Sequence, residues 1–140
     1  MEKKELLAPA GDIEAGYAAL CYGADAVYLG LQKFSARATA TNFAEEPLNE
    51  FVGYAHSLGR KVYAAVNTLV QQHELGDLIE TLDICVRCRV AGVIIQDMGV
   101  ARVVMESYPK LEMHASTQKA VHNKEGALAL QKDSFKPVVV

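Results

Sequence analysis

The stretch Gly92-Val93-Ile94-Ile95-Gln96 decides the fold, because it is a short apolar run that ends in a polar residue. An uninterrupted apolar run of this length is typical of a strand covered on both faces, as in a parallel sheet. Residues 75–86 carry apolar side chains at helical spacing before it, and Val100, Val103 and Val104 do so after it. The stretch therefore predicts a buried strand between two covering helices.

The same alternation of strand and helix recurs along the chain. Strands are predicted at residues 6–8, 26–30, 61–67, 92–96, 111–117 and 135–140, and helices at 12–23, 47–58, 75–86, 100–108 and 123–131. Strict alternation favours an α/β fold with a parallel sheet. We predict the N-terminal portion of a TIM-type (β/α) barrel, about five and a half of the usual eight units, as one truncated barrel domain over residues 1–140. A flavodoxin-like open sheet, which needs only five strands, is the alternative.

Residues at the expected helix ends support these boundaries. Asp12 suits an N-cap, because its carboxylate can accept from a free backbone N–H of the first turn. Gly23 and Gly59 suit helix C-termini, where a positive φ is common. Pro47 suits the first turn of the second helix, since that position needs no N–H donor.

Composition is that of a soluble globular protein, with 51% hydrophobic and 22% charged residues and a formal net charge of −3. This charge provides no general attraction to nucleic acid or anionic membranes. No apolar run reaches about 18 residues, so neither a transmembrane helix nor a membrane partner is predicted. Cys21, Cys85 and Cys88 are too few for a secreted disulfide scaffold, and a cytoplasmic location is predicted. Cys85 and Cys88 form a CxxC inside an amphipathic helix and are interpreted as ordinary helix residues.

Polar residues gather where the predicted strands end. Ligands of parallel α/β folds bind at the carboxyl ends of the strands, so these residues are candidates for a substrate-binding barrel mouth. The candidates are Arg37, Asn42, Asn67, Gln96, Asp97, His114, Ser116 and Gln118.

The fifth predicted strand is the most informative part of this mouth. Side chains alternate across a strand, so Met113 and Ala115 share one face and His114 and Ser116 share the other. Barrel lumens are mostly filled by branched apolar side chains, and a His and a Ser there indicate a polar pocket. The alternative is a buried histidine satisfied by a neighbour such as Gln96.

Arg37 lies in the long connection after the second predicted strand. A guanidinium group binds carboxylate or phosphate through two parallel hydrogen bonds, so Arg37 could hold an anionic substrate. An arginine that merely pins its own loop explains the position equally well.

Two other chemistries are disfavoured. A hydrolase triad of Ser116, His114 and Asp97 would place two members on one strand, and no GxSxG turn is present. A metal site of Asp97, His114 and His122 has no recognised ligand spacing, so no metal is predicted. The sequence assigns no catalytic residues.

Several segments together resemble the collagenase-like peptidase family, peptidase family U-32. They are ELLAPAG (5–11), YGADAVYLG (22–30), FSARA (34–38) with NF (42–43), KVY (61–63), VNTL (66–69), QD (96–97) and HASTQ (114–118) with HN (122–123). The resemblance implies a TIM-type barrel and a peptidase, hence a hydrolase. Other members of the family support hydroxylation of RNA bases or of a quinone ring and carry iron–sulfur clusters. Their cluster cysteines lie beyond the region that matches, so no cofactor is predicted for this chain and a cluster only for a longer parent.

Three functions follow as hypotheses: a collagenase-like peptidase, an RNA-base or quinone hydroxylation protein, and an inactive barrel remnant. The remnant is considered because family members continue past the position of Val140. The expected partners are a peptide or a small anionic substrate, with RNA in a longer parent. Exposed strand edges template pairing with another chain, so self-association through the open edges of the sheet is also expected.

Overall fold

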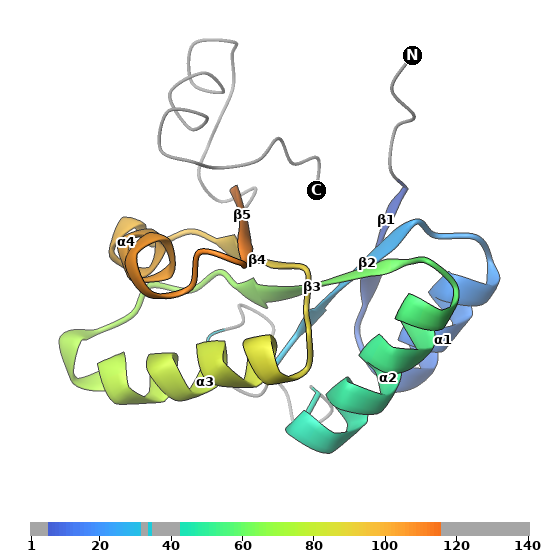
Figure 1. Cartoon of the computed structure of the whole chain (residues 1–140), viewed down its shortest axis with the longest axis horizontal. Coiled ribbons are helices and arrows are strands. Elements are labelled where there is room, and N and C mark those ends of the chain that lie inside the picture. The colour runs from blue at the N-terminus through green and yellow to red at the C-terminus, as the bar shows by residue number, and fades with distance from the viewer. Residues whose placement is uncertain (1–5, 32–33, 35–42, 116–140) are drawn as a thin grey trace, which may run out of the picture.

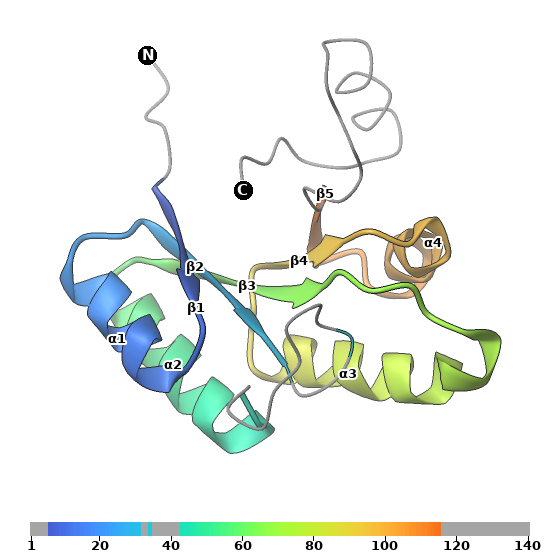
Figure 2. The same cartoon turned by 180° about the vertical axis from the view of Figure 1, so that it is seen from behind.

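The computed structural model describes residues 6–31, 34 and 43–115. Five strands form one sheet: β1 (Leu7–Ala10), β2 (Ala26–Gly30), β3 (Lys61–Val66), β4 (Gly92–Ile95) and β5 (Glu112–Ala115). The helices between them are α1 (Ile13–Cys21), α2 (Glu45–Ser57), the short 3-10 helix η1 (Gln72–Glu74), α3 (Leu75–Arg87) and α4 (Met98–Ser107). Figures 1 and 2 show α1, α2 and α3 on the same side of the sheet. In this part of the chain, no helix has the length and apolar character needed to cross a membrane.

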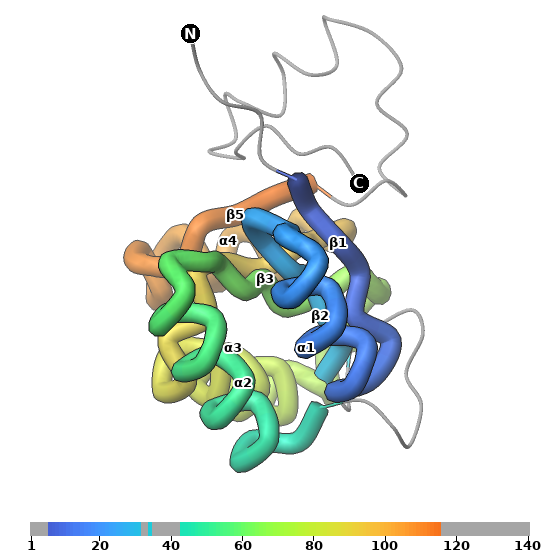
Figure 3. Tube along the Cα trace, turned by 90° about the vertical axis from the view of Figure 1, so that its right-hand side faces the viewer, coloured from blue at the N-terminus to red at the C-terminus, as the bar shows by residue number. Residues whose placement is uncertain are grey.

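The strand order identifies the type of sheet. The strands lie in the order β1-β2-β3-β4-β5, and every neighbouring pair is parallel. A doubly wound sheet reverses its order at a switch point, whereas a barrel adds each new strand beside the last one. The flavodoxin-like alternative is therefore wrong, and the predicted barrel-type α/β fold is confirmed. In Figure 3, α2, α3 and α4 follow one another around the strands.

The two faces of the sheet differ in what covers them. Val27, Val62 and Val93 belong to a large apolar core that also contains helix residues such as Leu48 and Leu82. The opposite face carries a smaller buried cluster, Ala26, Tyr63 and Ile94, with Leu7, Tyr28 and Ala91 packed against it. In a (β/α) barrel this second face points into the lumen.

Local signals explain most helix boundaries. Asp12 caps α1, and its Oδ1 accepts from the backbone N–H of Ala15 at 2.7 Å. Gly23 and Gly59 follow the C-caps of α1 and α2 with φ of +94° and +71°, values that favour glycine. The first helix therefore ends at Cys21, two residues before the predicted boundary.

The strands differ from the prediction mainly at their ends. β1 continues through Pro9 to Ala10, two residues beyond the predicted end at residue 8. Among the described strands β1 is an edge, where a missing N–H on one side is tolerated. β3 and β4 each end one residue early, at Val66 and Ile95. The strand predicted at 111–117 is seen as β5, while residues 116–117 and the segments predicted at 123–131 and 135–140 lie outside the described residues.

Candidate functional site

The carboxyl ends of β3 and β4 bring two amide side chains to the same edge of the sheet. The register pairs Val66 with Ile95, the last residues of the two strands. Asn67 and Gln96 come one step later, and both are half-buried. The structure thus places these two candidates of the predicted mouth beside one another.

Asp97 joins two connections at this edge through both of its carboxylate oxygens. Oδ1 accepts from the backbone N–H of Gly99 at 2.7 Å and caps α4. Oδ2 accepts from the backbone N–H of Val70, in the connection after β3, at 3.0 Å. Because each oxygen already has a backbone donor, Asp97 positions the loops around the mouth rather than offering a free carboxylate to a ligand.

Replacement of Asp97 by alanine should remove both bonds. We expect Asp97→Ala to lower the free energy of unfolding by about 2 kcal/mol, since a lost cap costs about 1 kcal/mol and the Val70 N–H loses its partner as well. Urea denaturation followed by circular dichroism measures this. Asp12→Ala is the matched control, because Asp12 caps α1 with one bond, and about 1 kcal/mol is expected. Equal losses in the two variants would contradict the double role of Asp97.

His114 lies on β5 opposite Ile94, on the face away from the helices. Its Nε2 lies 3.2 Å from Oε2 of Glu112, and its ring meets the Tyr63 ring edge-on with centroids 4.7 Å apart. Sequence reasoning offered Gln96 as the partner and missed both Glu112 and Tyr63. The two-residue spacing of Glu112 and His114 on one strand is the signal that could have found the first of them.

Arg37, Asn42, Ser116 and Gln118 lie outside the described residues, as does His122. Within the described ranges, no three His, Cys, Asp or Glu side chains are grouped so as to hold a metal ion.

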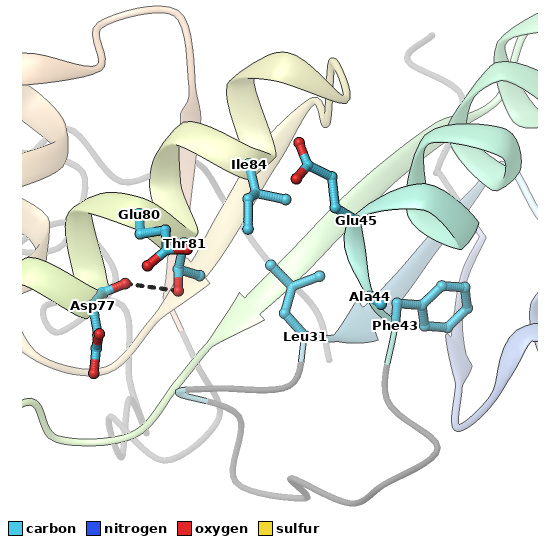
Figure 4. Close-up of a pocket in the computed structure, with 8 residues that line it drawn as sticks. All are labelled: Leu31, Phe43, Ala44, Glu45, Asp77, Glu80, Thr81 and Ile84. Carbon is cyan, nitrogen blue, oxygen red and sulfur yellow. Dashed lines mark hydrogen bonds between the residues drawn. The ribbon is translucent and has the colours of Figure 1, made fainter.

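A surface pocket lies elsewhere, between the start of α2 and α3 near the end of β2 (Figure 4). It is lined by Leu31, Phe43, Ala44, Glu45, Asp77, Glu80, Thr81 and Ile84. Thr81 donates its hydroxyl to the carbonyl of Asp77 within α3, and Glu45 accepts from Arg87 Nε at 2.7 Å, a hydrogen bond that lowers the pKa of Glu45. Asn67, Gln96, Asp97 and His114 are not among its lining residues, so this pocket is separate from the strand-end mouth.

The CxxC of α3 belongs to the packing of that helix. Cys85 and Cys88 are buried, and Cys88 Sγ lies 3.7 Å from the carbonyl oxygen of Glu45. Burial raises the pKa of Cys85 to about 12 and also raises that of Cys88. Since the thiolate is the reactive form, neither residue has the environment of a redox or nucleophilic cysteine.

Thiol labelling should distinguish the exposed Cys21 from the buried Cys85. At pH 8 a thiol with a pKa of about 12 is ionised in about one molecule in ten thousand. We expect iodoacetamide to modify the exposed Cys21 and to spare Cys85 in the folded chain, with all three modified in urea. Peptide mass spectrometry measures this. Labelling of Cys85 in the folded chain at the rate of Cys21 would contradict the burial of Cys85.

These features define the class of protein, a (β/α) barrel-type protein with polar side chains at the carboxyl ends of its strands. Residues 11–140 match peptidase family U32, and the chain belongs to this family. The resemblance seen in the sequence is therefore confirmed.

The chain is similar in sequence to proteins that are described with different functions. The chain is 42% identical over 119 residues to an uncharacterized protease of Methanocaldococcus jannaschii, covering 85% of this chain and 29% of that protein. It is 36% identical to tRNA hydroxylation protein P1 of Bacillus subtilis, covering 87% and 29%. It is 31% identical to a collagenase of Porphyromonas gingivalis, covering 86% and 29%. The chain thus spans about three-tenths of the length of these curated relatives.

Solved structures agree on the fold. The U32 peptidase Mk0906 superposes with a TM-score of 0.73 at 16% identity, over 96% of this chain and 59% of that one. Phosphoribosylanthranilate isomerase from Thermotoga maritima superposes with a TM-score of 0.58 at 14% identity, over 94% and 59%. At these identities the likeness concerns the fold alone.

Proposed function

We propose that this chain forms part of the substrate-binding barrel of a peptide-hydrolysing enzyme, and that its ligand lies at the mouth formed by the ends of β3 and β4. The adjacent placement of Asn67 and Gln96 carries this proposal. A carboxamide side chain both donates and accepts hydrogen bonds, as a peptide group does, so two adjacent carboxamides match the two polar groups of one peptide unit.

Two further points support a peptide substrate. Relatives described as a protease and a collagenase share at least 31% identity with the chain. Asp97 holds the connections that carry the two amides and is itself satisfied by backbone donors. A neutral substrate therefore meets no unpaired carboxylate from Asp97. Arg37, Asn42, Ser116 and Gln118 stay predictions for the same mouth, with Arg37 as the group for an anionic end of the substrate.

Peptide cleavage by the purified protein tests this proposal. A library of unmodified peptides and gelatin are the substrates, and new termini are detected by mass spectrometry. Asn67→Ala and Gln96→Ala should each raise KM or lower kcat/KM by about tenfold, the effect of one lost hydrogen bond of about 1.4 kcal/mol. Asn49→Ala, which removes an exposed amide from α2, should leave the rate unchanged. No cleavage by a protein free of contaminating proteases would reject the peptidase proposal.

Hydroxylation of an RNA base is the second candidate. It is favoured by the 36% identity with tRNA hydroxylation protein P1 and the 35% identity over 136 residues with the 23S rRNA 5-hydroxycytidine synthase of Escherichia coli. Asn and Gln amides also pair with base edges. A deletion strain should lose a hydroxylated nucleoside from tRNA or rRNA and regain it on complementation. Unchanged nucleoside profiles by mass spectrometry would reject this candidate.

A further inference from the structure

Three titratable side chains meet on the face of the sheet that points away from the helices. The hydroxyl of Tyr63, on β3, donates to Oε2 of Glu112 at 3.4 Å. Nε2 of His114 lies 3.2 Å from the same oxygen, and the Tyr63 and His114 rings stack edge-on at 71°. One carboxylate oxygen therefore serves both neighbours, and the three side chains form one connected group.

Gly92 makes this group possible. The register places Gly92 of β4 between Tyr63 and Glu112, which come from the strands on either side. A Cβ at Gly92 would lie 2.5 Å from the backbone oxygen of Glu112 and 2.8 Å from its Cβ. With no side chain at this position, β4 and β5 approach closely and the Tyr63 hydroxyl reaches across β4 to the carboxylate.

The surroundings of the group are largely apolar. Tyr63 is buried beside Ala26 and Ile94, and the His114 side chain is 12% exposed. The Glu112 side chain is 38% exposed, so one end of the group stays open to solvent. Polar groups at such a place need partners, and here each of the three has one.

We propose that Glu112 and His114 form a proton-transfer site on this face, with Tyr63 holding the carboxylate in place. When Nε2 carries the proton and donates it to Glu112, the lone pair of the imidazole is left on Nδ1. Among the described residues, Nδ1 of His114 has no hydrogen-bond partner. A carboxylate that fixes the tautomer of a histidine and stabilises its cation is the arrangement that turns an imidazole into a general base.

The ligand is a neutral molecule with an O–H or N–H group, water included. In the transfer, the O–H or N–H bond of the ligand breaks, an Nδ1–H bond forms, and the electron pair of the broken bond stays on the ligand oxygen or nitrogen. The imidazolium is stabilised by Glu112 until the proton returns to the product, so no oxidant or reductant is needed. The inference goes beyond the proposed function, because the site is defined by its own hydrogen bonds and serves either substrate class.

Hydrolysis of 4-nitrophenyl acetate by the full chain tests the site without peptide or RNA. His114→Gln should reduce the rate to that of buffer, and Glu112→Gln should reduce it by about tenfold or more. His56→Gln removes an exposed histidine from α2 and should leave the rate unchanged. Circular dichroism establishes that each variant is folded. Equal rates for the His114 and His56 variants would overturn the proposal, whatever the outcome of the peptide and RNA assays.

A second measurement isolates the positioning role of Glu112. Long-range ¹⁵N–¹H spectra of histidine-labelled chain at alkaline pH report which nitrogen of each neutral imidazole carries the proton. We expect His114 to carry it entirely on Nε2, and to show a mixture of tautomers in Glu112→Leu, where no acceptor remains. A proton on Nδ1 in the unmodified chain, or no change on loss of Glu112, would overturn the proposal.

Discussion

Gly92→Ala is expected to lower the free energy of unfolding by about 3 kcal/mol, because the new methyl group would overlap the backbone of β5. The nearest atom would be a carbonyl oxygen 2.5 Å away, and no rotation of a side chain can relieve that contact. The strands must separate, which weakens the β4–β5 pairing and pulls Glu112 away from Tyr63. Urea denaturation followed by circular dichroism measures the loss.

Gly53→Ala is the matched control for this prediction. Gly53 lies in the middle of α2, is exposed, and has nothing within 4 Å of a Cβ built on it. Alanine favours the helix over glycine, so a gain of about 0.5–1 kcal/mol is expected. If Gly92→Ala were as stable as the original chain, the close approach of β4 and β5 would be refuted.

Phe51→Ala has the other large expected effect and should lower the free energy of unfolding by about 4 kcal/mol. Phe51 is fully buried between α1 and α2 and meets the Tyr17 ring edge-on, with centroids 5.2 Å apart. Gly16 faces the ring so closely that a Cβ there would lie 2.9 Å from it, so α1 is packed directly on Phe51. Removal of the ring leaves a cavity that the two helices cannot close without moving.

Tyr54→Ala provides the comparison on the same helix. The Tyr54 ring also contacts the Tyr17 ring, with centroids 5.2 Å apart, but Tyr54 is 39% exposed. Its replacement is therefore expected to lower the free energy of unfolding by only about 1 kcal/mol. Both variants are measured by urea denaturation. Equal losses would show that Phe51 is not the centre of the contact between α1 and α2.

The strands and helices were largely predictable because their signals are local. The run Val93-Ile94-Ile95 needs only its own side chains to predict a buried strand, and Asp12 needs only the next three residues to act as a cap. The order of the strands is different, since strict alternation is compatible with both a barrel and a doubly wound sheet. That choice depends on how the sheet as a whole covers its two faces.

The candidate site was predictable only in part, because several of its contacts join residues that are far apart in the sequence. The carboxyl-end rule placed Asn67 and Gln96 together, because it needs only parallel strands. The bond between Asp97 and Val70 joins residues 27 positions apart, and no local pattern indicates it. The contact between Tyr63 and Glu112 depends on the absence of a side chain at Gly92, on a third strand.

The meeting of strand ends at one opening is tested most directly by a disulfide between positions 67 and 96. Adjacent strands lie about 4.8 Å apart, within the Cα separation that a disulfide spans. In a Cys21→Ser background, Asn67→Cys with Gln96→Cys should cross-link under mild oxidation. Asn67→Cys with Ala91→Cys, which an antiparallel β4 would bring together, should not. Cross-linking of the second pair in place of the first would contradict the account.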